Sequence, residues 1–209
     1  MLTKLSTHEV TTILGVQFDS ISFLRSAHTL GQCPEDCGRE VAIAGLSNVG
    51  KSSVINVLGN NRNLARTSKS PGRTQLLNFF LISDSCRLVD LPGYGFARVP
   101  AAVKQHWGKV LQAYFEHRRS LVGLVLVMDI RHPFKPYDEQ MLSWCQAKGL
   151  PVHILLNKAD KLSRSAGLRV LAEVNSKYCV DNGVSAQLFS ALSRGGIDGV
   201  KEKLRRWFV

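Results

Sequence analysis

The chain has 209 residues, with 27 Lys and Arg against 16 Asp and Glu, a formal net charge of +11 and a pI near 9.7. Its apolar share of 44% suits one globular domain, and no apolar run approaches the about 20 residues that span a bilayer. The excess of cations favours a polyanionic partner, either nucleic acid or an anionic membrane surface. Residues 1–16 lack the pattern of a signal peptide, and five scattered cysteines do not resemble a disulfide framework. We therefore expect a cytoplasmic protein with no stable membrane insertion.

Short apolar runs alternate with helical patterns along most of the chain. Residues 1–22 are predicted to form a partly flexible N-terminal extension, and residues 23–209 a single domain. Near-continuous apolar strands separated by helices predict an α/β fold of three layers, with a mostly parallel central sheet and helices on both faces. Strands are predicted at 41–46, 76–82, 87–91, 122–130, 152–156 and 186–189. Helices are predicted at 51–58, after Pro100, around 141–145, over 168–178 and over 197–208.

A glycine-rich loop follows the first of these strands. Its sequence is Gly45-Leu46-Ser47-Asn48-Val49-Gly50-Lys51-Ser52. The glycines let backbone N–H groups converge on phosphate oxygens, and the N-terminus of the next helix adds a positive dipole end. In this pattern Lys51 is expected to reach the β- and γ-phosphates, and Ser52 to ligate Mg²⁺. A merely structural turn would not require Lys and Ser at its last two places.

A second motif, Asp90-Leu91-Pro92-Gly93, ends another apolar strand. Asp-x-x-Gly alone describes many turns, so its position after a strand carries the argument. There Asp90 is expected to hold Mg²⁺ through water, and the Gly93 N–H to sense the γ-phosphate.

The third motif, Asn157-Lys158-Ala159-Asp160, follows the strand at 152–156. A carboxylate at Asp160 can accept from the ring N–H and the exocyclic amine of guanine, whereas adenine offers neither donor. Asn157 and the stem of Lys158 are expected to frame the base. The backbone of Phe189-Ser190-Ala191 is expected to complete the pocket. The alternative for Asp160 is a helix N-cap.

A polar loop at 60–75 is long enough to suggest a functional role. Within Gly72-Arg73-Thr74-Gln75-Leu76, which we include among the nucleotide-binding residues, Thr74 can give Mg²⁺ a second protein oxygen once the loop closes. No acid lies between Val41 and Ser83, and the cations beyond Lys51 exceed what one triphosphate needs. They either contact phosphates of a nucleic acid or are solvated. These cations are Arg62, Arg66, Lys69 and Arg73.

With these motifs the chain resembles the translation-factor-like P-loop GTPases and, within them, the EngB family. The more specific marks are Ser47–Ser53, Arg66–Gln75, Asp90–Gly95 and Met128–Pro133. The resemblance implies the three-layer P-loop GTPase (G domain) fold, with GTP and GDP as ligands. It also implies a GTPase that acts in assembly of the large ribosomal subunit and is needed for normal cell division and septation. Leu46 and Val49 stand where Arg and Ala are expected, and neither removes a required donor.

The expected catalytic groups are Lys51, Asn48, Thr74 and Gly93. Tyr94 follows Gly93, where many switch GTPases carry the Gln that orients the attacking water, so we expect slow hydrolysis without help. By resemblance to potassium-activated relatives, Asn48 holds K⁺ near the phosphates; alternatively it only shapes the loop. Arg131 and His132 have no role that the sequence assigns.

These observations favour a monomeric, Mg²⁺-dependent GTPase switch that binds the large ribosomal subunit or its rRNA. The alternative is a nucleotide-gated scaffold at the division site or membrane, with incidental hydrolysis. The lack of a lipidation motif or basic amphipathic anchor weakens the membrane version. An ATP-using P-loop kinase is disfavoured by Asn157 and Asp160.

Overall fold

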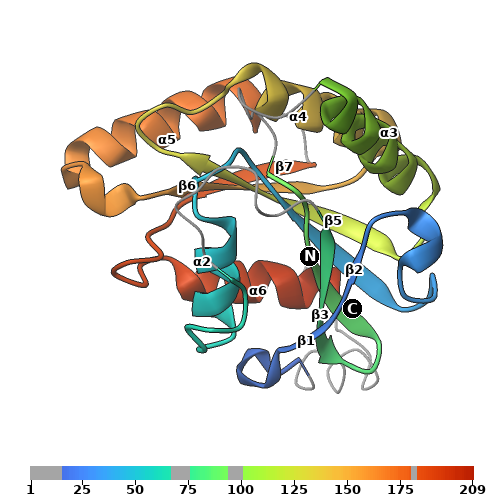
Figure 1. The fold of residues 1–209 in the computed structure, drawn as a ribbon. Coiled ribbons are helices and arrows are strands. Elements are labelled where there is room, and N and C mark those ends of the chain that lie inside the picture. Colours follow the sequence, from blue (N-terminus) through green and yellow to red (C-terminus); the bar gives the residue numbers. More distant parts are fainter. Residues whose placement is uncertain (1–15, 67–75, 94–100, 180–182) are drawn as a thin grey trace, which may run out of the picture.

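The structure, a computed structural model, describes residues 16–66, 76–93, 101–179 and 183–209. Their strands form one seven-stranded sheet in the order β1-β3-β4-β2-β5-β6-β7 (Figure 1). β2 pairs in parallel with β4 and β5, the β5–β6 and β6–β7 pairs are parallel, and β1–β3 and β3–β4 are antiparallel. The predicted mostly parallel α/β sheet is confirmed. The strands are β1 (Ser22–Ala27), β2 (Arg39–Ala44), β3 (Leu77–Ser83), β4 (Cys86–Asp90), β5 (Leu121–Asp129), β6 (Val152–Asn157) and β7 (Val184–Leu188).

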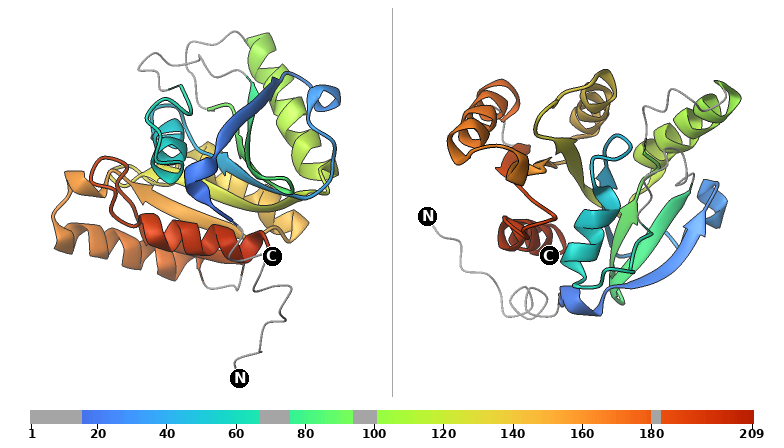
Figure 2. Two further views of the ribbon diagram at one scale, coloured as in Figure 1. Left: turned by 90° about the horizontal axis from the view of Figure 1, so that it is seen from below. Right: turned by 60° about the vertical axis from the view of Figure 1, so that its left-hand side comes forward.

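Helices cover both faces of the sheet, which gives the three predicted layers. One face carries α3, α4 and α5, and the other carries α2 and α6, which lie side by side (Figures 1 and 2). The α-helices are α2 (Lys51–Leu58), α3 (Ala101–His117), α4 (Pro136–Lys148), α5 (Arg164–Tyr178) and α6 (Ile197–Trp207). Short 3₁₀ turns are η1 (Phe18–Ser20), η2 (Leu30–Gln32) and η3 (Ala159–Lys161).

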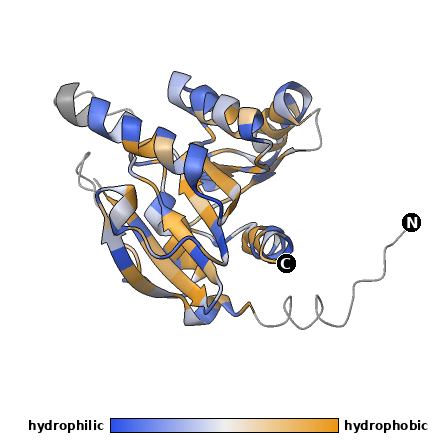
Figure 3. Ribbon diagram, turned by 90° about the vertical axis from the view of Figure 1, so that its right-hand side faces the viewer, coloured by the Kyte–Doolittle hydropathy of each residue, from blue (hydrophilic) through white to orange (hydrophobic). Residues whose placement is uncertain are grey.

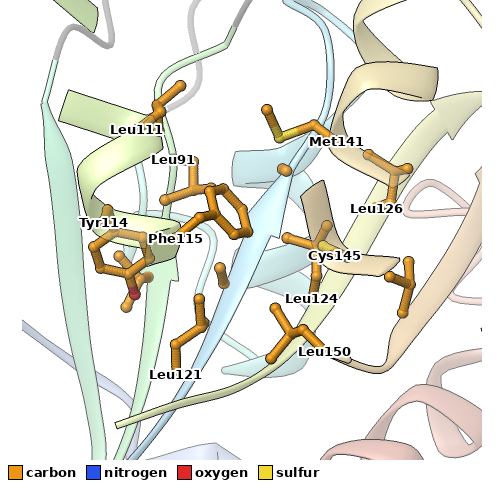
Figure 4. Packing of buried hydrophobic residues seen from close by; sticks show 14 of the residues in the cluster. Leu91, Leu111, Tyr114, Phe115, Leu121, Leu124, Leu126, Met141, Cys145 and Leu150 are labelled. Carbon is orange, nitrogen blue, oxygen red and sulfur yellow. The ribbon is translucent and has the colours of Figure 1, made fainter. Parts of the chain in front are cut away.

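The apolar side chains gather in two clusters, one on each side of the sheet. Side chains of β2, β4 and β5 point alternately into the two clusters, which is why these strands are apolar on both faces. The first cluster packs α3 and α4 on the sheet, with Tyr114, Phe115 and Met141 among its large members (Figure 4). In Figure 3 the strands are accordingly mostly orange, while blue marks much of the helices' outer surfaces.

The segment before β1 packs against the C-terminal helix. Phe18 is 3% exposed and belongs to the second cluster, together with Val16, Ile21 and residues of α6. Lys201 Nζ lies 5.6 Å and Arg205 Cζ 5.3 Å from the centre of its ring. Because Val16, Phe18 and Ile21 are buried in this cluster, we propose that the domain begins at or before Val16 rather than at residue 23. The rest of the predicted extension lies outside the described residues.

A buried ion cluster holds the amino ends of the central strands together. Glu40 of β2 is fully buried and accepts from Arg118, whose Nη2 lies 2.6 Å from Oε1 and whose Nε lies 2.9 Å from Oε2. Arg87 of β4 pairs with the same carboxylate at 3.0 Å, and the Tyr114 hydroxyl donates to it at 3.1 Å. Burial and the neighbouring Glu40 raise the pKa of Tyr114 well above its usual value. One carboxylate thus ties β2 and β4 to α3 and the residue just after it.

None of the helices in the described residues is long and apolar enough to cross a bilayer. The longest, α3, has 17 residues, and a spanning helix needs about 20 that are mostly apolar. The five cysteines are free thiols.

Candidate functional site

The predicted motifs meet at the carboxyl ends of four neighbouring strands. The glycine-rich loop leaves β2, Asp90 ends β4, Asp129 ends β5 and Asn157 ends β6. Carboxyl ends of parallel strands lie at one edge of a sheet, which is where ligands bind in this class of fold. The sheet therefore brings together residues that are more than 100 positions apart.

The glycine-rich loop is shaped by its glycines and by Lys51. Gly45 has φ +146°, and a Cβ there would lie 2.3 Å from the carbonyl oxygen of Val127. Lys51 begins α2 as predicted and is 8% exposed, and its Nζ donates to the carbonyl oxygens of Gly45 at 3.0 Å and Leu46 at 3.2 Å. Burial lowers the pKa of Lys51, while the charge of Asp90 opposes that shift. The ammonium group thus lies within the curve of the loop, where it can meet phosphate oxygens.

Gly93 lies directly against this lysine. A Cβ on Gly93 would be 2.8 Å from Lys51 Nζ and 3.3 Å from the Cα of Ser47. The second motif is therefore in contact with the first, as a sensor of the terminal phosphate requires. Leu91 and Pro92, which lie between Asp90 and Gly93 in the chain, are buried. The Leu91 N–H donates to the Ile43 carbonyl at 3.0 Å.

Asp90 has the features of a cation ligand. It is 2% exposed, and its Oδ1 has no hydrogen-bond partner among the described residues. Burial raises its pKa to about 6, although Lys51 and the Ser52 hydroxyl both favour the ionised form. Carboxylate and hydroxyl oxygens are ligands that Mg²⁺ prefers, so Ser52 and Asp90 fit the ion. When bound, Mg²⁺ would neutralise charge on the phosphate oxygens.

Asn157 joins the glycine-rich loop to the loop after β7. It is 2% exposed; its Nδ2 donates to Val49 at 2.7 Å, and its Oδ1 accepts from the Ala191 N–H at 3.2 Å. Lys158 makes a second link, because its Nζ donates to the Asn48 carbonyl at 2.8 Å. Phe189 ties the loop after β7 to the third motif. It is 1% exposed; its N–H donates to the Leu156 carbonyl and its carbonyl accepts from the Ala159 N–H, at 3.0 Å each.

Asp160 faces Ser190 of the loop after β7. The Ser190 hydroxyl donates to Asp160 Oδ1 at 2.6 Å, and this bond is the main reason why the pKa of Asp160 lies below its ordinary value. Asp160 lies inside η3, and the N-cap of the following helix α5 is Ser163, so the alternative of a helix cap is wrong. The lowered pKa favours the ionised carboxylate, which is the form that can accept from two donors.

Several predicted site residues lie outside the described part of the chain. These are Gly72, Arg73, Thr74 and Gln75, together with Lys69 and Tyr94, so their roles stay predictions. Leu76 is half-buried just before β3. Sequence reasoning missed Asp129, which pairs with Lys158 at 2.9 Å and with Arg131 at 2.7 Å. Its position at the end of an apolar strand was the available signal.

Known structures share this fold. The chain aligns with a crystal structure of a probable GTP-binding protein, engB, with a TM-score of 0.66 and 22% identity over 81% of this chain and 98% of that one. It aligns with Era from Aquifex aeolicus bound to GDP·AlF4⁻ with a TM-score of 0.65 and 21% identity, over 82% of this chain and 57% of that one. A structure of Era with MgGDPNP and nucleotides 1506–1542 of 16S ribosomal RNA gives 0.63 and 20%, over 82% and 57%. At these identities the likeness shows the fold.

The family follows from the sequence match. Residues 40–158, which are 119 of the 209 (158 − 40 + 1), match the 50S ribosome-binding GTPases. This range includes the glycine-rich loop, Asp90 to Gly93, and Asn157 and Lys158. Proteins of this kind bind guanine nucleotides, hydrolyse GTP and generally use Mg²⁺. The chain belongs to the 50S ribosome-binding GTPase family.

Proposed function

We propose that this protein is a monomeric, cytoplasmic, Mg²⁺-dependent GTPase switch that binds the large ribosomal subunit or its rRNA, acts in subunit assembly and is thereby needed for normal cell division and septation. The observation that supports nucleotide binding is a pair of hydrogen bonds made by the Asn157 side chain. One goes to the Val49 carbonyl at 2.7 Å, and the other comes from the Ala191 N–H at 3.2 Å. They join the loop that would hold phosphates to the loop that would hold guanine. The ribosomal half is supported by the family match and by the net charge of +11.

The loop after α2 presents cations on an ordered backbone. Asn56, 8% exposed, donates from Nδ2 to the carbonyls of Arg62 at 2.9 Å and Ala65 at 3.0 Å, and its Oδ1 accepts from the Ala65 N–H at 2.6 Å. Arg62 and Arg66 are exposed on this loop. A fixed backbone reduces the entropy lost when their guanidinium groups bind phosphates, which supports these two residues as rRNA contacts.

Hydrolysis is proposed to be slow until a cation or the ribosomal partner assists. Asn48 has φ +62°, an uncommon conformation for a residue other than glycine, and the Lys158 ammonium holds its carbonyl. Asn48 is exposed on the glycine-rich loop, so a cation can reach its side chain, and this exposure supports K⁺ binding there. We expect turnover to be faster in KCl than in NaCl, and faster again with large subunits. An Asn48→Ala variant should lose the difference between the two salts, whereas a native rate equal in both would overturn the role of K⁺.

Co-sedimentation with large subunits tests the partner. The native protein is run on sucrose gradients with a non-hydrolysable GTP analogue, with GDP and without nucleotide. We expect subunit binding to depend on nucleotide state and to weaken as salt rises, by a log–log slope of roughly one per phosphate contact. Absence of binding under all three conditions would overturn the ribosomal assignment.

A double variant and a matched control test the loop after α2 that carries Arg62 and Arg66. Arg62→Ala with Arg66→Ala should reduce subunit binding and its salt slope while GTP affinity stays native. The control is Arg164→Ala with Arg169→Ala, which removes two exposed cations from α5. If subunit binding and its salt slope stay native in the Arg62 and Arg66 variant, this loop is not the rRNA contact; Lys201, Lys203, Arg205 and Arg206 of α6 are then the next residues to change. A loss in the α5 pair alone would place the contact on α5.

A further inference from the structure

Arg131 closes a compact hydrogen-bonded ring on Asp129. Its Nε donates to Oδ1 at 2.9 Å, its Nη2 to Oδ2 at 2.7 Å, and its backbone N–H to Oδ1 at 3.1 Å. Two parallel guanidinium bonds and a backbone bond fix both the position and the rotation of the carboxylate. Asp129 side-chain exposure is only 15%, whereas that of Arg131 is 44%. The pair therefore has an inner carboxylate and an outer cation.

Lys158 connects the Asp129 carboxylate to the glycine-rich loop. The Lys158 ammonium lies 2.9 Å from Asp129 Oδ2 and 2.8 Å from the Asn48 carbonyl oxygen. Lys158 itself has φ +65°, so its backbone is also in a restricted conformation. Asp129 and Asn157 are paired neighbours on β5 and β6, which places the carboxylate beside this lysine. The contacts run in series from Arg131 through Asp129 and Lys158 to the glycine-rich loop.

The loop that carries Arg131 is fixed at both of its ends. At its start the Ile130 N–H donates to Asn157 at 2.9 Å. Farther along, Phe134 has φ +59°, unusual for a bulky residue, and its ring stacks on Tyr178 with centres 4.0 Å apart and planes 14° apart. Arg131 is thus held by its backbone and does not have to be ordered by the ligand.

We propose that Arg131 and Asp129 are positioning residues for the guanine nucleotide: they hold the Lys158 ammonium against the Asn48 carbonyl, so that the lysine stem stays in place beside the base. The proposal rests on the nucleotide site described above. Arg131 takes both lone pairs of Oδ1 and one of Oδ2, which leaves one lone pair of Oδ2 for Lys158. Without Arg131 the carboxylate can rotate, and the ammonium loses one of its two fixed partners.

Nucleotide titration of the full chain, with fluorescent GDP and GTP analogues, tests this. Arg131→Ala should weaken GDP binding by about tenfold and speed its dissociation, a size expected for losing a charged hydrogen bond. Arg131→Lys keeps the charge but cannot form the two-pronged contact, so it should not restore affinity. The matched control is Arg206→Ala, which removes an exposed arginine that is paired with Glu202 on α6; it should bind like the native protein.

A double-mutant cycle separates positioning from general destabilisation. In a Lys158→Ala background, Arg131→Ala should cause no further loss of affinity, because its effect passes through the missing lysine. An equal loss in both backgrounds, a native affinity for Arg131→Ala, or full restoration by Arg131→Lys would each overturn the positioning role. If the native protein itself binds no guanine nucleotide, the proposed function fails instead, and the two failures are distinguishable.

Discussion

The side-chain amide of Asn157 packs against the Cα of Gly50, in the space that a side chain at position 50 would fill. A Cβ on Gly50 would lie 2.4 Å from Asn157 Nδ2, the atom that donates to Val49 at 2.7 Å. Gly50 also has φ +105°, a conformation that other residues rarely adopt. The glycine therefore serves two purposes: it allows the turn into α2, and it admits the amide that joins the two halves of the site.

Gly50→Ala should accordingly lose nucleotide binding. The methyl group displaces the Asn157 amide, and the strained backbone adds about 1–3 kcal/mol of destabilisation. Isothermal titration with GDP and urea unfolding measure the two effects.

Gly108→Ala is the control for this substitution. Nothing lies within 4 Å of a Cβ at Gly108 in the middle of α3, so alanine should raise the free energy of unfolding by about 0.5–1 kcal/mol and leave GDP affinity unchanged. Equal behaviour of the two variants would contradict the argument from Asn157.

Asp160→Asn should change base preference. An amide cannot accept from both guanine donors as a carboxylate does, so GTP affinity should fall by about 1.5–3 kcal/mol while xanthine nucleotides gain. Competition titrations with GTP, XTP and ATP measure the shift. Asp198→Asn, an exposed position on α6, is the control and should keep the native order. A native protein that binds ATP and GTP equally would refute the assignment of Asp160.

Glu40→Gln should destabilise the fold without altering the site. The substitution leaves the buried charges of Arg87 and Arg118 without their shared partner, which costs about 3–5 kcal/mol. Urea denaturation measures this loss, and Glu202→Gln, in an exposed pair with Arg206, should cost less than about 1 kcal/mol. Glu40 lies at the amino end of β2, away from the nucleotide motifs, so GDP affinity of the folded variant should be native.

Acidification should destabilise the protein through His153. This side chain is 5% exposed between Ser185 at 2.8 Å and Gln187 at 2.9 Å, and burial holds its pKa below the usual value, with Lys203 acting in the same direction. The unfolded chain takes up a proton at a pKa of about 6.5 while the native state stays neutral. Stability from this group is therefore present above that pH and is lost as pH falls through the native pKa.

Urea unfolding at several pH values between 7.5 and 5 measures the effect. His153→Gln should show a smaller loss of stability on acidification than the native protein, and the exposed His132→Gln should show the native loss. An identical pH profile for His153→Gln and the native chain would exclude this contribution.

The part of the fold that could be predicted is the part with local signals. Helix α2 has the predicted bounds, because the glycine-rich loop precedes it and Gly59 caps its end. The first predicted strand, 41–46, begins two residues earlier and ends at Ala44, since Gly45 already turns into the loop. The motifs of the site were likewise predictable, because each is a short run after an apolar strand.

The contacts that remained hidden depend on which strands are neighbours. Asp129 acquires its role only because β5 pairs with β6, and Glu40 only because β4 and the end of α3 reach the same point from 47 and 78 residues away (87 − 40 and 118 − 40). Burial of Val16 and Phe18 depends on α6 in the same way. No pattern within a short window reports such distant partners.

The contact between Phe18 and α6 has a consequence for synthesis of the chain. Phe18 and Leu204 belong to one core cluster although 186 positions separate them (204 − 18). At about 5–20 residues per second, the ribosome needs roughly 10–40 s to make the chain between them. During that interval the apolar side chains of η1 and α2 cannot yet pack against α6. The residues of the first cluster, beneath α3 and α4, are all synthesised before α6. We therefore expect the first cluster to be complete before the second, which needs α6.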